Sequence, residues 1–557
     1  MQTEDTIQKK KVIIKKLLEK GILVNKLILE KINLISDFDA FSQNFEENIH
    51  KLIQQSNNLN SINNLDNTNN THNNDVNNSN NANNVNNVNN INNVNDTDQS
   101  INNDSDLINK LKRNGKVNVL FSYKSEPKKR EVKDFVSYFT SRYHILRSIL
   151  MNRKELMGAT SISKLKLKED RDTVAVIGIV KTKSITKNDN VILTLEDPTD
   201  EIKVIISKNK AEQLELAKDC VPDEVLGITG PLSGDVIFVN ELILPDVPLF
   251  KELKKAPEET YAAFIGDLHF GSSFFLQEAF DKFINWIQGN HGNQHQKDLA
   301  NKIKYLFIVG DIVEGVGIYP GQEDELTIKD IYKQYEEFTK YLKKIPSDIQ
   351  IIIIPGNHDA MRIAEPQPPL YKDFAEKMYD LPNVTMLSNP AMVNIEKSEK
   401  FPGLDILLYH GFSFPHYADS VPSIRSQGGQ QRVDLIMKFL LQRRHLAPTH
   451  TSTLYLPDAD KDHLVIDHVP DYFVTGHIHR VSAANYRSVT MLNCSCWLST
   501  TEFQEKMGLK PQPARVILTN LQTRKAKILK FIDDEEPKVE DEKKSESKDS
   551  NLEVAQT

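Results

Sequence analysis

The chain has 557 residues, a formal net charge of −8 and 26% charged residues. Its length suggests roughly three or four domains, and its negative charge disfavours a protein that coats nucleic acid by bulk charge alone. No stretch approaches the roughly 18 to 20 apolar residues of a membrane span, and the lysine-rich start lacks the pattern of a signal peptide. The three cysteines argue against a disulfide framework and favour a reducing, cytoplasmic location.

The first 165 residues divide into three segments. Residues 1–55 space Leu, Ile and Val at mixed intervals of three and four, which predicts a helical module that is either a packing unit or a docking site for a partner. Residues 56–106 are dominated by asparagine and hold few large apolar side chains, so we expect a disordered linker. Residues 107–165 form a connecting region with a strand at VNVLFSYK and a helix at DFVSYFTSRYHILRSILM.

Residues 166–252 predict a small β-barrel. Three β-branched runs separated by polar turns are followed by a helix-like stretch, KAEQLELAKD, and then by two more apolar runs. Five strands with a helix between the third and the fourth are typical of a Greek-key barrel of the OB type. Such barrels often bind single strands of nucleic acid through stacking aromatics. Few aromatics lie in these strands, so a structural or protein-docking barrel is an equally valid interpretation.

Residues 257–530 alternate apolar runs with helical stretches, which predicts a layered α/β domain. Each apolar run ends in a polar cluster, and the ends of strands are where such folds place their ligands. The last segment, residues 531–557, is charged and nearly devoid of large apolar groups, so we expect a disordered tail. The predicted fold class is therefore multidomain α/β, with a helical module, an OB-type barrel and a layered α/β domain.

Five strand-end motifs in the α/β domain supply candidate metal ligands. They are GDLH, VGD, PGNHD, YHG and GHIH, which contain Asp267, His269, Asp311, Asn357, His358, His410, His477 and His479. In GDLH and GHIH the two polar residues stand two apart, and strand alternation would point both to one side. The neighbouring glycines permit tight turns and close approach of the backbone.

The types of these side chains indicate their chemistry. Carboxylates, imidazoles and an amide without any thiolate suit Mn, Fe or Zn in a catalytic site rather than a structural zinc site. One aspartate can bridge two ions, and two ions can hold a phosphate and activate a water for attack on phosphorus. The sequence therefore predicts a hydrolase that acts on phosphate esters.

The order of these motifs resembles that of the calcineurin-like metallophosphoesterase superfamily. By that resemblance one metal is held by Asp267, His269, Asp311 and His479. The other is held by Asp311, Asn357, His410 and His477, with Asp311 as the bridge. His358 would be the catalytic acid for the leaving oxygen, oriented by Asp359. Glu314 departs from the pattern, because an aspartate is common at that position, and we expect it not to bind metal directly.

The segments GDIVEGVGIYPGQ, PGNHDAMRIAEPQP and LLQRRHLAPTH narrow the resemblance to the small, exonuclease subunits of archaeal family-D DNA polymerases. That resemblance implies a Mn-dependent 3′→5′ exonuclease used in proofreading on single-stranded or mismatched 3′ ends of DNA. It also implies a stable heterodimer with a large catalytic polymerase subunit. A contact with the sliding clamp stays open, since no clamp-binding peptide is clear in the sequence.

Two other functions remain open at this point. The chain could be mainly a structural polymerase subunit, although its complete set of ligand residues argues against a purely structural role, or it could be a phosphatase of the same superfamily. Arg362 and Arg425 are candidate contacts to substrate. Arg443 and Arg444 either touch DNA phosphates or form a basic helix end, and we expect His416, His445 and His450 to be surface or packing residues.

Overall fold

The computed structural model describes residues 115–124, 128–458, 460–501, 504 and 510–532. The predicted helical module 1–55, the linker 56–106 and all but the first two residues of the tail 531–557 lie outside these described residues. Within the described part, no helix is long and apolar enough to cross a membrane.

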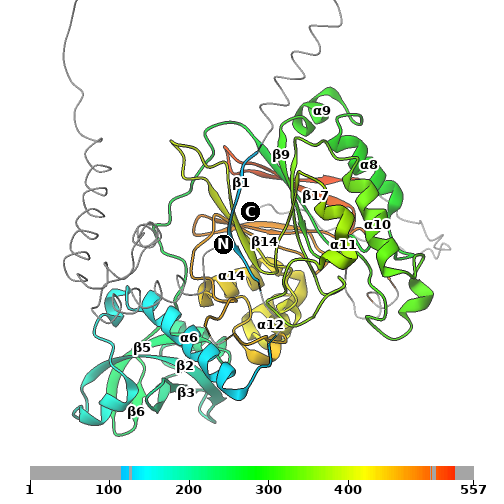
Figure 1. Ribbon diagram of the computed structural model, residues 1–557. Coiled ribbons are helices and arrows are strands. Elements are labelled where there is room, and N and C mark those ends of the chain that lie inside the picture. Colours follow the sequence, from blue (N-terminus) through cyan, green and yellow to red (C-terminus); the bar gives the residue numbers. More distant parts are fainter. Residues whose placement is uncertain (1–114, 125–127, 459, 502–503, 505–509, 533–557) are drawn as a thin grey trace, which may run out of the picture. The chain divides into compact units, whose positions relative to one another are not determined.

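Two six-stranded sheets form the centre of the C-terminal region (Figure 1). In spatial order the first sheet contains β1 (Val117–Ser122), β12 (Ala391–Ile395), β13 (Leu404–Leu408), β14 (Tyr472–Thr475), β16 (Val489–Asn493) and β15 (Ser482–Tyr486). The second sheet contains β11 (Val384–Met386), β10 (Gln350–Ile354), β9 (Ile303–Val309), β8 (Tyr261–Ile265), β17 (Arg515–Asn520) and β18 (Ala526–Lys530). Strands β8, β9 and β10 are parallel neighbours, as are β13 and β14.

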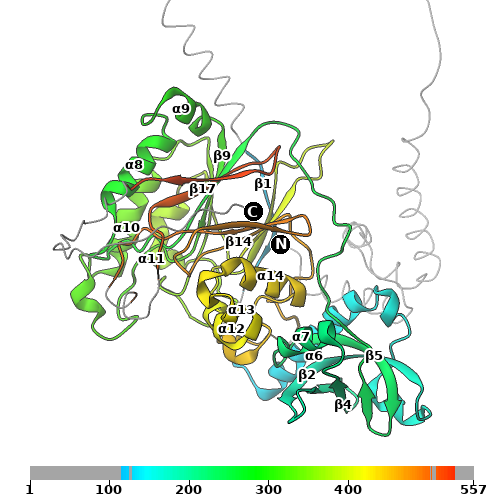
Figure 2. The same ribbon diagram turned by 180° about the vertical axis from the view of Figure 1, so that it is seen from behind.

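The two sheets are the middle layers of a four-layered structure. Their facing sides share one apolar core, to which Phe264, Phe307 and Leu408 contribute. Outside the second sheet lie α8 (Gln277–Ile287), α9 (Gln294–Ala300), α10 (Ile331–Leu342) and α11 (Lys372–Tyr379), and outside the first lie α12 (Phe414–Ser420), α13 (Pro422–Ser426) and α14 (Val433–Arg443) (Figures 1 and 2). The central strands are mostly apolar because both faces of each sheet are covered. The prediction of a layered α/β region is thereby confirmed.

A five-stranded barrel precedes this region, as predicted. Strands β2 (Thr173–Ile185), β3 (Val191–Glu196), β4 (Glu201–Ile206), β6 (Val236–Phe238) and β5 (Val225–Ser233) pair in that order, and β5 closes the ring on β2. In chain order, helix α7 (Ala211–Lys218) lies between the third strand, β4, and the fourth, β5, as predicted. Strand β7 (Glu241–Ile243) pairs with β5 at its edge. The alternation seen in β3 and β4 buries one side of each strand in the barrel core.

The connecting region belongs to both neighbours. Strand β1 pairs antiparallel with β12 and so extends the first sheet. Helix α6 (Val132–Leu150) packs Tyr143 and Leu146 against the barrel, while its Tyr138 joins the core beneath α12 and α14. The strand and the helix predicted here are both present, and together they tie the barrel to the layered region.

Buried ion pairs reinforce this junction. The Arg142 guanidinium of α6 donates through Nε to Asp462 Oδ2 at 2.7 Å and through Nη1 to the carbonyl of Pro448 at 2.6 Å. Arg443 Nε donates to the barrel carboxylate Glu224 Oε2 at 2.8 Å. All four charged side chains are buried. Breaking one such buried pair typically costs about 3–5 kcal/mol, because a charge is left without a partner.

Candidate metal centre

The five polar motifs come together at one edge of the two sheets. Asp267 follows β8, Asp311 follows β9 and Asn357 follows β10, while His410 follows β13 and His477 follows β14. Because the parallel strands run in the same direction, their carboxyl ends open on a common edge. The prediction that polar clusters terminate the strands is confirmed.

The paired residues of the GDLH and GHIH motifs are oriented by left-handed backbone conformations rather than by alternation along a strand. β8 ends at Ile265, and both Asp267 and His269 lie beyond it with φ values of +50° and +53°. His477 and His479 repeat the pattern after β14, with φ values of +69° and +56°. The expectation that alternation along a strand brings each pair to one side was therefore wrong. Side chains other than glycine rarely adopt this conformation, and such strain concentrates at functional sites.

Glycines allow the motif loops to pack against one another. A Cβ atom placed on Gly356 would lie 2.2 Å from Asp311 Oδ1, and one on Gly476 would lie 2.6 Å from Asp267 Oδ2. Hydrogen bonds then connect the loops, since His358 N donates to Asp311 Oδ1 at 2.8 Å and His477 N donates to Asp267 Oδ1 at 2.9 Å. Both aspartates thus receive backbone donors from a neighbouring loop, and Asp311 keeps its Oδ2 for His410.

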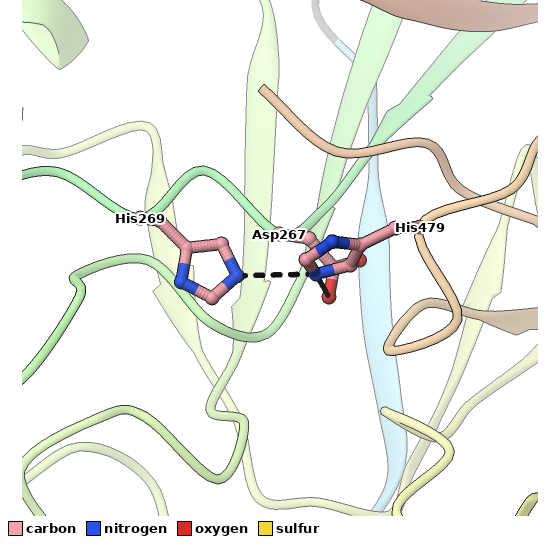
Figure 3. Close-up of side chains that lie close together, drawn as sticks. All are labelled: Asp267, His269 and His479. Atoms are coloured by element: carbon pink, nitrogen blue, oxygen red, sulfur yellow. Dashed lines mark hydrogen bonds and ion pairs between the residues drawn. The ribbon is translucent and has the colours of Figure 1, made fainter. Parts of the chain in front are cut away.

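The first cluster contains Asp267, His269 and His479 (Figure 3). The two imidazole Nε2 atoms lie 3.3 Å apart, and His479 Nε2 lies 3.6 Å from Asp267 Oδ1. His269 Nδ1 lies 2.9 Å from Glu314 Oε2, and against the opposing effect of burial this carboxylate raises the pKa of His269 to about 9. Such a carboxylate behind a histidine is typical of metal-binding imidazoles.

The second cluster contains Asp311, His410 and His477. His410 Nδ1 lies 2.9 Å from the carbonyl oxygen of Val309, which places the ring hydrogen on Nδ1. The other nitrogen, Nε2, then faces Asp311 Oδ2 at 3.1 Å and Asn357 Oδ1 at 3.1 Å. These three atoms converge on one point, where a cation, either a proton or a divalent metal ion, would be held by all of them. The types of these donor atoms and their convergence fit a divalent ion such as Mn, Fe or Zn.

Burial sets the electrostatics of both clusters. It raises the pKa of Asp267 to about 7, helped by Asp311. Burial and the neighbouring His410 lower the pKa of His477 to about 3, so this imidazole is neutral and able to bind metal. Burial also acts to lower the pKa of His410, but Asp311 outweighs it and raises that pKa to about 10. The negative charge of Asp311, which holds a proton on His410, would also attract a metal cation to this position.

The predicted catalytic acid stands at the rim of the site. His358 is partly exposed, its ring centroid lies 4.7 Å from that of His269, and its Nδ1 lies 2.9 Å from the carbonyl oxygen of Glu314. Asp359 was expected to orient this ring. Its carboxylate instead accepts hydrogen bonds from Gly356 N, Ile312 N and the Tyr335 hydroxyl. Asp359 therefore fixes the loops that follow β9 and β10, and Glu314 holds the His358 ring.

The central part of this region matches a family model. Residues 262–483 match the model that describes the B-subunit of DNA polymerases alpha and epsilon. A protein of Methanothermobacter thermautotrophicus named DNA polymerase II small subunit is 41% identical over 390 residues, which are 70% of this chain and 78% of that protein. The chain belongs to the family of DNA polymerase II small subunits. The predicted resemblance to the small subunits of these archaeal polymerases is confirmed.

Other members of the family are similar over the same share of the chain. The DNA polymerase II small subunits of Pyrococcus furiosus and Methanocaldococcus jannaschii are 38% and 40% identical, over 72% and 70% of this chain. In both cases the matched part spans 64% of the relative's own length.

Several further residues named from the sequence now have a place. Arg443 and Arg444 of the RRHLAP segment are buried at the barrel junction, where Arg444 Nε donates to the carbonyl of Ile466, so the helix-end interpretation holds for this pair. His445 is also buried there and bonds Asp462, which makes it a packing residue. Arg362 donates to the carbonyl of Pro366, and Arg425 is exposed.

Sequence reasoning missed the role of Glu314. It is buried, and its carboxylate lies 2.9 Å from His269 Nδ1 while its carbonyl contacts His358. A third group of candidate ligand atoms consists of His269, Glu314 and His358. The sequence held one signal for this role: an acidic residue, Glu314, follows Asp311 by three positions and so lies on the same loop as a candidate ligand. From there its carboxylate reaches His269 of the GDLH motif.

Proposed function

We propose that this family member is the 3′→5′ exonuclease of a two-subunit DNA polymerase and that it hydrolyses the terminal phosphodiester with two metal ions. The observation that carries the proposal is the convergence of five strand-end motifs on two buried clusters, in a chain of the DNA polymerase II small-subunit family. The layered region 257–530 would then be a calcineurin-like phosphoesterase domain. The barrel 166–252 would be an OB-type domain.

The donor sets suit two divalent ions in a catalytic rather than a structural role; Mn²⁺ is the proposed ion, with Fe and Zn as chemically compatible alternatives. Asp267, His269 and His479 would hold one ion, His410, His477 and Asn357 the other, and Asp311 would bridge them. Bound ions of this kind neutralise the phosphate charge and lower the pKa of the attacking water.

The chain's own residues would carry the proton transfer. His358 would give its Nε2 proton to the 3′ oxygen of the strand as the bond between phosphorus and that oxygen breaks. The water oxygen replaces it on phosphorus, the water's proton passes to solvent, and the terminal nucleotide leaves with its 5′-phosphate. The carbonyl of Glu314, 2.9 Å from His358 Nδ1, keeps the ring turned so that Nε2 is the donor.

The partners follow from the family. The name small subunit implies a large polymerase subunit, which would supply polymerisation while this chain supplies proofreading and a scaffold. The substrate would be the single-stranded or mismatched 3′ end of DNA, with Arg362 and Arg425 as candidate contacts to it. A contact with the sliding clamp is a further candidate partner interaction.

The test uses the full chain purified with its large partner from the native cell. In Mn²⁺, a 3′-mismatched oligonucleotide should lose mononucleotides, and His358→Ala should slow this by roughly 10²- to 10⁴-fold, the usual contribution of a general acid. His416→Ala, a histidine on α12, is the matched control and should keep the rate. An unchanged rate in His358→Ala would refute the role of His358. Turnover of a phosphomonoester dye without any release from DNA would instead favour a phosphatase.

A further inference from the structure

A loop beside the candidate centre exposes an apolar surface. Between Glu314 and Gln322 the chain reads GVGIYPG, and Val316, Ile318 and Tyr319 are 48%, 39% and 38% exposed. Scattered apolar residues are common on protein surfaces, but here three stand together within four positions. We call this segment, residues 315–321, the apolar platform.

Buried amides hold the apolar platform in place. Gln334 is fully buried, and its side chain both accepts from Gly315 N at 2.9 Å and donates to Gly315 O at 3.1 Å. Gln322 is also buried, accepts from Ile318 N at 2.9 Å and donates to the Glu314 carbonyl at 3.0 Å. A loop fixed by two buried side chains keeps its exposed residues in one arrangement, which lowers the entropy lost when they bind a ligand.

Tyr319 connects the apolar platform to the reacting groups. Its hydroxyl lies 3.2 Å from Glu314 Oε1, and the other oxygen of that carboxylate holds His269. Its ring centroid lies 6.5 Å from that of His358. At Gly315 a Cβ atom would lie 2.5 Å from the carbonyl oxygen of His358, so the platform packs directly on the loop that carries the candidate acid.

We propose that Tyr319, flanked by Val316 and Ile318, stacks on the penultimate base of the DNA strand. This inference rests on the proposed function, in which His358 protonates the 3′ oxygen of the penultimate nucleotide. The base attached to that nucleotide is the one nearest to His358 on the leaving side. Stacking on an aromatic ring tolerates every base, which suits an enzyme that must degrade any sequence.

Binding tests this inference without any catalysis. The full chain with its large partner is titrated, in Mn²⁺, into oligonucleotides whose terminal linkage resists hydrolysis and which carry fluorescent 2-aminopurine at either the penultimate or the terminal position. Stacking should quench the penultimate label in the wild type. Tyr319→Ala should weaken this quenched binding roughly fivefold to 150-fold, since base–aromatic stacking contributes about 1–3 kcal/mol.

Two control variants make the result specific. Tyr319→Phe keeps the ring and should quench as the wild type does, which separates stacking from the hydroxyl contact. Tyr332→Ala removes a tyrosine that is 52% exposed but stacks on Phe374 of α11, and it should have no effect. No quenching in the wild type, equal quenching in Tyr319→Ala, an equal loss in Tyr332→Ala, or a loss at the terminal label alone would each overturn the inference.

Cleavage then separates this inference from the proposed function. If the wild type releases no mononucleotide from a normal 3′ end, the proposed exonuclease fails whatever the fluorescence shows. If it does, an abasic penultimate nucleotide should slow it about as much as Tyr319→Ala does, and combining the two should add little further loss. Independent, multiplying losses would overturn the stacking contact while leaving the exonuclease in place.

Discussion

The candidate centre and the barrel junction are both buried clusters of histidines and carboxylates, yet they differ in how their polar atoms are paired. At the junction, His445 Nδ1 accepts from Ala447 N at 3.0 Å, so Nε2 carries the hydrogen that it donates to Asp462 at 2.8 Å. In the centre, His410 Nε2 faces oxygens of Asp311 and Asn357, and against the effect of burial Asp311 raises the pKa of His410 to about 10, so that these atoms hold a proton between them. His445 supplies its own donor to Asp462, whereas the centre needs a cation, a proton or a metal ion, among its acceptors.

The centre and the barrel junction also differ in backbone conformation. Five candidate ligands of the centre have positive φ, namely Asp267, His269, Asp311, His477 and His479. At the junction Arg444 is also left-handed, but it is the residue that ends α14, where this conformation is the usual helix stop. No helix end accounts for the five in the centre. Strain without a local structural reason, together with acceptors that converge on one point, distinguishes a ligand site from a structural ion pair.

The largest expected effect comes from a substitution that destabilises the junction and leaves the centre unchanged. Asp462→Ala removes the carboxylate that receives both Arg142 and His445, and it should lower the free energy of unfolding by about 3–5 kcal/mol because buried charge is left unpaired. Chemical denaturation measures this. The binding of Mn²⁺ to the folded variant should be unchanged, and a comparable loss of metal affinity would show that the two clusters are not independent.

The junction should also weaken in acid. Burial and Arg142 lower the pKa of His445 to about 4, from an ordinary value near 6.5. Between about pH 6.5 and about pH 4, His445 is protonated in the unfolded chain but not in the folded chain. The free energy of unfolding should therefore fall as the pH drops through this range, by at most about 3 kcal/mol for this group. Denaturation curves of the wild type and His445→Gln measure the difference, and parallel curves over this range would contradict the assignment.

The centre should respond to metal where the junction does not. Mn²⁺ at about 100 times its dissociation constant should raise the free energy of unfolding by about 2.7 kcal/mol per site, because it binds the folded chain alone. Asp311→Asn should lose most of this gain, since Asp311 contacts His410 and would bridge the ions. His416→Ala is the matched control. Thermal unfolding with and without Mn²⁺ gives both values, and an equal gain in Asp311→Asn would exclude the bridge.

Much of this arrangement was predictable, and the remainder was hidden for physical reasons. Apolar runs ending in polar clusters located the strands and the residues after them, because a strand buried on both faces leaves only its end for function. The left-handed turns at Asp267 and His479 were not visible, since the sequence at those positions has no glycine. Nor was the placement of Arg443, because a charged residue at a helix end has the same pattern whether it faces solvent or a buried Glu224.

The smallest expected effect tests Glu314, which belongs to the centre although it was not expected to bind metal. Glu314→Gln keeps the shape of the side chain but removes the charge that faces His269 Nδ1 at 2.9 Å. Loss of such a supporting carboxylate typically costs about 10- to 100-fold in metal affinity or activity, because the imidazole loses basicity and orientation.

Calorimetric titration with Mn²⁺ measures that affinity, and Glu325→Gln, a half-buried position on the same loop, is the matched control, since it also contacts Tyr319 but not His269. If Glu314 acted only as a packing residue, as Asp359 does for the backbone of its loops, the glutamine would preserve the affinity for Mn²⁺. If it supports the metal ligand, the affinity for Mn²⁺ falls, and the boundary of the centre then includes Glu314.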